Sequence, residues 1–162
     1  GSIVMEARVR QAALNTGEVF IGFSDVNTDL AIIEGAICHG DTVTVTLTAS
    51  DLVGFLMASD LTDNSDWHGV YNGGTTTGET TSTSVDFDAG ATAGEYQVLR
   101  LELFPNGTAE WWVDGVLEQT VTGAVSTSVD LCLNVIVESK TTAVKTMDVD
   151  YIRVWANRDW TV

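Results

Sequence analysis

Acidic side chains are grouped in segment 60–66 at a spacing that could bind a cation. This segment reads DLTDNSD and contains Asp60, Asp63 and Asp66, whose oxygens are the kind of ligand that calcium prefers. Its spacing departs from the calcium-loop motif, which requires a central glycine and a terminal glutamate. We therefore favour an acidic turn in an acidic protein, and calcium binding by these three aspartates is the alternative.

A second acidic pair, Asp148 and Asp150, lies near the C-terminus. Residues two apart on a β-strand point to the same face, and two carboxylates at close range raise one pKa unless a cation or an arginine intervenes. Such a pair could act as general acid and base, or bind a metal. The alternative, which we favour, is that both carboxylates lie in solvent at the end of a sheet.

Aromatic residues form the third candidate site. Some must lie outside the core, because Trp111 and Trp112 are neighbours on one predicted strand and cannot face the same side. Aromatic faces on a concave sheet hold sugar rings by stacking, and aromatic residues are also favoured at protein interfaces. We slightly favour burial against a neighbouring subunit. The candidates are Trp67, Tyr71, Trp112, Tyr151, Trp155 and Trp160.

The remaining nucleophiles and bases show no catalytic pattern. Cys38 and His39 are adjacent and would point to opposite faces of a strand, and the sequence has no nucleophile elbow, HExxH motif or phosphate-binding loop. We interpret His39 and His68 as structural. Cys38 and Cys132 are too few for a disulfide framework; a single bridge is formally open, and we favour two buried free thiols.

Composition predicts one acidic domain over residues 1–162. The 162 residues carry a formal net charge of −16 with only seven Lys and Arg, and the sequence pI is about 4.1. This charge would repel nucleic acid and anionic membrane surfaces. The apolar runs are too short for a membrane-spanning helix, and the N-terminus lacks a signal-peptide pattern. We therefore expect neither nucleic acid nor a membrane as a partner.

The candidate residues must be positioned by β-strands, and the clearest strands lie in segment 96–119. There Leu99 and Leu101 alternate with charged residues, and Asn106-Gly107 and Asp114-Gly115 are typical hairpin turns. We interpret 27–33 as a short helical turn and 73–82 as an exposed loop or edge strand. Further strands are predicted at 3–10, 18–25, 43–48, 52–59, 67–72, 85–87, 129–138 and 145–156.

This pattern predicts an all-β fold. About a dozen short strands without a convincing long helix or a fixed repeat are typical of two antiparallel sheets packed face to face. We predict a two-sheet antiparallel jelly-roll sandwich.

Two strings in the chain resemble the concanavalin A-like lectin and glucanase superfamily. They are the hairpin Trp111-Trp112-Val113-Asp114-Gly115 and the final strand 147–155, MDVDYIRVW. Family 16 glycoside hydrolases of this superfamily carry a Glu-x-Asp-x-x-Glu strand, and no acidic residue here has that spacing. The resemblance thus implies the fold without the catalytic pair. It also implies calcium binding through Asp150, which occupies the position of the calcium-binding Asp in such hydrolases.

A closer likeness is to laminin-G-like structural proteins of tailed bacteriophages. It rests on several short motifs, at residues 5–10, 19–25, 53–56, 66–70, 99–115 and 148–152. Members of that group have a further segment before the strand that corresponds to residues 5–10. This chain lacks that segment, so the resemblance implies either a complete domain or one whose edge strand is completed by another segment or subunit.

From these observations we expect a non-enzymatic structural protein of the virion, a capsid decoration or capsid-associated protein assembled in the host cytoplasm. Its partners would be other virion proteins, copies of itself among them, in a homo-oligomer or larger assembly. The alternative is a carbohydrate-binding module that adheres to a host glycan, and the third candidate is a glycan-active enzyme related to family 16 hydrolases. We expect no cofactor, with calcium as the one ion under consideration.

Overall fold

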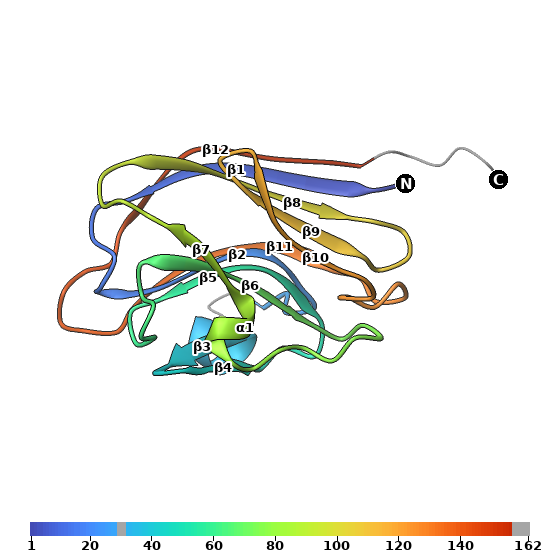
Figure 1. The fold of residues 1–162 in the computed structure, drawn as a ribbon, viewed down its shortest axis with the longest axis horizontal. Coiled ribbons are helices and arrows are strands. Elements are labelled where there is room, and N and C mark those ends of the chain that lie inside the picture. Colours follow the sequence, from blue (N-terminus) through green and yellow to red (C-terminus); the bar gives the residue numbers. More distant parts are fainter. Residues whose placement is uncertain (29–31, 157–162) are drawn as a thin grey trace.

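Two five-stranded antiparallel sheets pack face to face in the computed structural model, which describes residues 1–28 and 32–156 (Figure 1). This confirms the predicted jelly-roll sandwich. Sheet A contains, in spatial order, β10 (Val116–Val121), β9 (Ala109–Val113), β8 (Tyr96–Leu103), β1 (Ile3–Gln11) and β12 (Met147–Ala156). Sheet B contains β11 (Cys132–Ser139), β2 (Gly17–Ser24), β5 (Leu52–Ala58), β6 (Asp66–Asn72) and β7 (Asp86–Gly90).

A covering layer of short elements lies against the outer face of sheet B. It consists of η1 (Ile33–Ile37), the paired strands β3 (Cys38–Asp41) and β4 (Thr44–Leu47), and α1 (Ser82–Val85). Ile37, Val45 and Val85 from this layer join a second hydrophobic cluster with Phe20 and Leu56 of sheet B. As a result β2 and β5 are buried along their whole lengths.

The sequence indicated only part of this layer. The helical turn predicted at 27–33 is absent from the described residues 27, 28 and 32, and a single turn, η1, instead follows at Ile33–Ile37; residues 29–31 lie outside the described residues. Strand β3 and helix α1 were missed, and α1 begins at the end of the segment predicted as a loop. Strand β3 reads Cys-His-Gly-Asp without an apolar alternation, and the four residues of α1 complete only about one helical turn, so periodicity does not reveal either element.

Sheet A follows the predicted alternation. In β9 the odd positions Ala109, Trp111 and Val113 are buried and the two between them are half-buried. The predicted turns are present, with Gly107 and Gly115 at φ values of 79° and 84°. These left-handed conformations are the reason for glycine at both positions.

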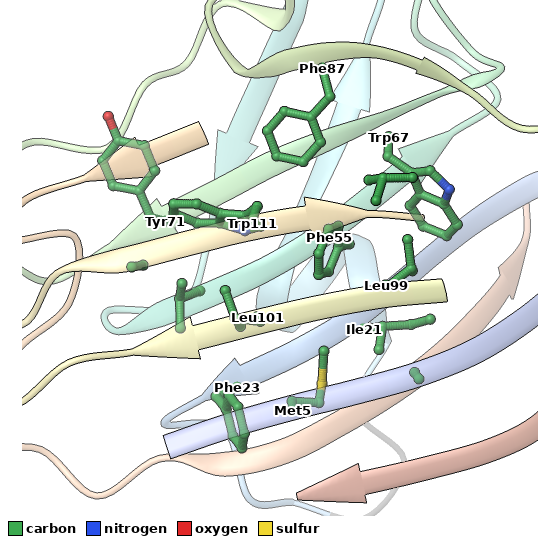
Figure 2. Packing of buried hydrophobic residues seen from close by; sticks show 14 of the residues in the cluster. Met5, Ile21, Phe23, Phe55, Trp67, Tyr71, Phe87, Leu99, Leu101 and Trp111 are labelled. Carbon is green, nitrogen blue, oxygen red and sulfur yellow. The ribbon is translucent and has the colours of Figure 1, made fainter. Parts of the chain in front are cut away.

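Aromatic and aliphatic side chains of both sheets fill the space between them (Figure 2). Trp111 of β9 is fully buried, and its indole N–H donates a hydrogen bond of 2.9 Å to the Gly54 carbonyl of β5. Phe55 packs edge-on against Trp67, with ring centroids 6.2 Å apart. This polar tryptophan contact therefore joins the two sheets inside a largely apolar core.

No helix in the described part of the chain has the length and apolar character required to cross a bilayer. Both cysteines are free thiols, Cys38 buried and Cys132 half-buried.

Glu18 of β2 is a carboxylate buried beneath the covering layer. Its side chain is 0% exposed, accepts a hydrogen bond of 3.2 Å from the Gly40 N–H, and lies 3.8 Å from Lys140 Nζ. Burial raises the pKa of Glu18 from 4.5 to about 7, against the opposing effect of Lys140. The folded protein therefore holds a proton here that the unfolded chain releases at lower pH.

Replacing Glu18 with glutamine should stabilise the protein above pH 7. Because the pKa is about 7 in the folded protein and 4.5 in the unfolded chain, wild-type stability should fall as pH rises between these values and stay lowered above them. Glu18→Gln removes the ionisation, so urea unfolding should show similar stability at pH 4 and a gain of about 2–4 kcal/mol at pH 8, since each unit of pKa difference corresponds to about 1.4 kcal/mol. The same pH dependence in both proteins would contradict this assignment.

Candidate functional site

Two of the predicted surface aromatics, Trp67 and Tyr71, belong to the core. They are 1% and 3% exposed, and both point from β6 toward sheet A, near Phe55 and Trp111 respectively (Figure 2). Trp67 Nε1 donates to Gln97 Oε1 at 2.9 Å, which satisfies its polar atom. The placement of these two residues outside the core was wrong, because β6 is covered on both faces. Trp160 lies outside the described residues.

The outer face of sheet A carries the other predicted aromatics. Strand register places Trp112 beside Arg100, and Tyr151 and Trp155 beside Arg8 and Val4. Trp112 and Tyr151 are half-buried, whereas Trp155 is 43% exposed. These side chains come from β9 and β12, which are separated in the sheet by β8 and β1. They therefore do not form one continuous row of aromatic rings.

Arginines on this face were not predicted as site residues. Arg8, Arg10, Arg100 and Arg153 account for four of the seven basic residues in the chain. The guanidinium carbons of Arg8 and Arg10 lie 4.2 and 5.0 Å from the centroid of the Tyr96 ring. Such stacking holds the planar cations flat against an aromatic surface. The basic residues were scattered in sequence, and the strand register gathers them.

Tyr151 links this face to β1. Its hydroxyl donates a hydrogen bond of 2.8 Å to Glu6 Oε1, and this bond raises the pKa of Tyr151. Across the same strand pair Arg153 lies opposite Glu6, with its guanidinium 4.9 Å from the Tyr151 ring. The face therefore combines aromatic, cationic and anionic groups at short range.

Asp148 and Asp150 are each bound by an arginine. Arg8 Nη1 lies 2.7 Å from Asp150 Oδ2, and Arg10 Nε donates to Asp148 Oδ2 at 3.0 Å. A bulge in the β1–β12 register makes Asp150 an extra residue between Val149 and Tyr151. The two arginines balance the charge of the carboxylate pair, which the sequence alone could not show. Arg8 pairs with Asp150, the residue that the resemblance implied for calcium binding.

The acidic segment 60–66 joins β5 to β6, and its three aspartates do not converge. Among the residues that the structure describes, the group of acidic and histidine side chains close enough to share an ion is Asp63, His68 and Asp86. Burial, and then the nearby Asp86 carboxylate, raise the pKa of Asp66. His68 and Asp86 were missed as partners of Asp63, and their alignment across β6 and β7 depends on strand pairing.

One side of the sandwich is open between β11 and β12, the last strands of sheets B and A. On β11, Leu133, Val135 and Val137 lie opposite core residues of β2, yet they remain 38%, 36% and 36% exposed. On β12, Val149 and Val154 lie opposite core residues of β1 and are 44% and 46% exposed. Directly paired residues lie on the same face of a sheet, so these five side chains point inward and are not covered. We refer to them as the open side.

A hollow lined by both apolar and polar residues lies near the open side, next to residues 129–131 that precede β11. It has a volume of about 490 Å³ and is lined by Ile3, Phe23 and Val129, among others. Ile3 and Val129 are each 40% exposed. Apolar surface on this part of the molecule therefore extends beyond the two edge strands.

Comparison with known proteins places this fold. No family model matches the chain, and the curated proteins contain no match. A β-glucanase of Bacillus licheniformis is similar in structure with a TM-score of 0.56 and 16% sequence identity, over 98% of this chain and 67% of the other. The fold is a concanavalin A-like jelly roll.

Two sialidases are also similar. That of Trypanosoma rangeli matches with a TM-score of 0.53 and 12% identity, and a second sialidase with 0.54 and 9%. The matches cover 95% and 96% of this chain but only 20% and 13% of the sialidase chains. At these identities the likeness establishes the fold, and the expected kinship with phage proteins stays a prediction.

Truncation of the predicted aromatics should separate core from surface. Trp67→Ala should cost about 3–5 kcal/mol because it leaves a large cavity, whereas Trp155→Ala should change stability by less than about 0.5 kcal/mol. Urea unfolding followed by circular dichroism measures both. A large loss on Trp155→Ala, or none on Trp67→Ala, would contradict the placement of these two side chains.

Proposed function

We propose that this protein is a non-enzymatic structural protein of a phage particle, a decoration or capsid-associated protein whose sandwich is completed by a neighbouring protein subunit. The resemblance in sequence supplies the phage context. The observation that carries the assembly role is the open side, where Val135, Val149 and Val154 are core-facing and exposed.

The open side offers both kinds of contact that strand addition uses. Strands β11 and β12 are the edge strands of their sheets, so each has a row of backbone groups without a strand partner within the described chain. Alternate apolar side chains next to such an edge suit an extended segment that pairs through its backbone and buries its own apolar side chains. A subunit of the same particle, either another copy or a capsid protein, would supply this segment.

A non-catalytic role agrees with the acidic residues. Asp148 and Asp150 are bound by Arg10 and Arg8, which balance their charges. The outer face of sheet B lies under the covering layer. The carboxylate spacing of the family 16 hydrolases is also absent from the sequence.

Carbohydrate binding is the alternative that a specific observation favours. Trp112, Tyr151 and Trp155 lie on the outer face of sheet A, with polar groups between them that could bind sugar hydroxyls. The structurally similar β-glucanase and sialidases are, by their names, proteins that act on glycans. A host glycan would then bind on a different surface from the open side.

Particles of the phage that encodes this chain should contain it in a fixed ratio to the capsid protein. In reconstitution on particles that lack it, Val135→Lys should reduce occupancy at least about tenfold, because it places a charge in an apolar contact; this equals about 1.4 kcal/mol. Quantitative mass spectrometry of purified particles measures both. The matched control is Trp155→Ala, on the outer face of sheet A and away from the open side, which should bind like the wild type. Lost attachment of this variant would instead indicate that the neighbouring subunit covers the aromatic face, as the sequence suggested.

The same two variants distinguish the alternative. Glycan-array binding that is lost on Trp155→Ala and retained on Val135→Lys would establish carbohydrate recognition. The assembly role fails if purified particles lack the chain, or if Val135→Lys, shown to be folded by circular dichroism, attaches as well as the wild type.

A further inference from the structure

Three side chains from separate segments meet at the edge of sheet B. Asp63 lies in the connection between β5 and β6, His68 lies on β6, and Asp86 is the first residue of β7. One carboxylate oxygen of each aspartate and one ring nitrogen of His68 lie within 4.8 Å of one another. Ligand atoms that share one ion at 2.0–2.4 Å are separated by at most about 4–5 Å, so a single cation can contact all three.

His68 is the observation that distinguishes this group from an ordinary acidic cluster. Its side chain is 0% exposed, and Nδ1 lies 3.0 Å from the Asp66 carbonyl oxygen. Because a carbonyl only accepts, Nδ1 carries the proton and Nε2 presents a lone pair. Within the described structure Nε2 has no hydrogen-bond partner. Buried polar atoms are rarely left in this state.

This arrangement is the one that orients histidines for metal binding. A metal-bound imidazole commonly donates its other N–H to a backbone carbonyl or a carboxylate, which sets the tautomer and the direction of the ring. The Asp66 carbonyl fulfils that role for His68. Asp86 is held as well, because its Oδ1 accepts a hydrogen bond of 3.0 Å from the Asp88 N–H.

The ligand types favour a transition metal over calcium. Calcium prefers a shell made only of oxygen ligands, whereas an imidazole with two carboxylates suits Zn²⁺ and Mn²⁺. Asp63 and Asp86 are only partly buried, which leaves a path for the ion and room for water ligands. Their two negative charges would be balanced by a divalent cation.

We propose that Asp63, His68 and Asp86 bind one divalent transition-metal ion of the Zn²⁺ or Mn²⁺ class, with water completing the coordination. The ion would fasten the β5–β6 connection to the start of β7. Strand β7 is one of the two edge strands of sheet B, and its register with β6 shifts between Asp66 and His68, so the backbone pairing there is interrupted. The role is structural and is independent of the proposed function.

Isothermal titration with Zn²⁺ and Mn²⁺, after treatment with a chelator, tests the site. One equivalent should bind and raise the melting temperature by several degrees, because the ion binds the folded state. Asp63→Asn and Asp86→Asn should each weaken binding about tenfold or more. In the Asp86→Asn variant the amide oxygen can still accept the hydrogen bond from the Asp88 N–H. Weaker binding would therefore result from the lost negative charge and not from a disturbed local backbone.

Asp60→Asn is the matched control, since Asp60 lies in the same acidic segment but outside the group. It should bind the metal like the wild type. Nitrogen-15 spectra give a second readout: the chain has two histidines, and the metal should shift Nε2 of His68 while the ring of His39 is unchanged.

Three results would overturn the site. They are absence of binding to the chelator-treated protein, equal weakening by Asp60→Asn and Asp63→Asn, and displacement of Zn²⁺ by an equimolar amount of Ca²⁺.

Discussion

The packing of sheet A against sheet B around Trp111 is the constraint on which the rest of the structure depends. This side chain is fully buried, and its hydrogen bond to the Gly54 carbonyl joins β9 to β5 across the core. An indole N–H without a partner in this position would be costly, so the bond restricts how the sheets can slide. The outer faces of the two sheets then differ. The outer face of sheet A is exposed to solvent, whereas that of sheet B lies under the covering layer.

This difference decides which surfaces can interact. The covering layer removes the outer face of sheet B from use, and β2 and β5 are buried along their full lengths. What remains is the outer face of sheet A, which holds four arginines of an otherwise strongly acidic chain, and the open side between β11 and β12. The first is polar and internally paired, and the second is apolar and uncovered, so they suit different kinds of partner.

Two ionisable groups lie beneath the covering layer, and each is accommodated differently. Glu18 has the Gly40 N–H and Lys140 beside it, and burial still raises its pKa to about 7. His68 gives Nδ1–H to the Asp66 carbonyl, and its Nε2 has no hydrogen-bond partner within the described structure. Buried polar groups restrict the register of the strands that carry them, because a slip by one residue would move each to the opposite face.

The sequence by itself determined the sandwich, because alternation along a strand and the turn chemistry of Asn106-Gly107 and Asp114-Gly115 are local properties. It could not decide which aromatics are buried: alternation separates the faces of a strand but does not say what covers them, and β6 is covered on both. The arginine partners of Asp148 and Asp150, the approach of Asp86 to His68 and the open side all follow from pairing between distant segments. Only the tertiary structure sets that pairing, since it is the sum of many weak contacts that no single stretch of sequence contains.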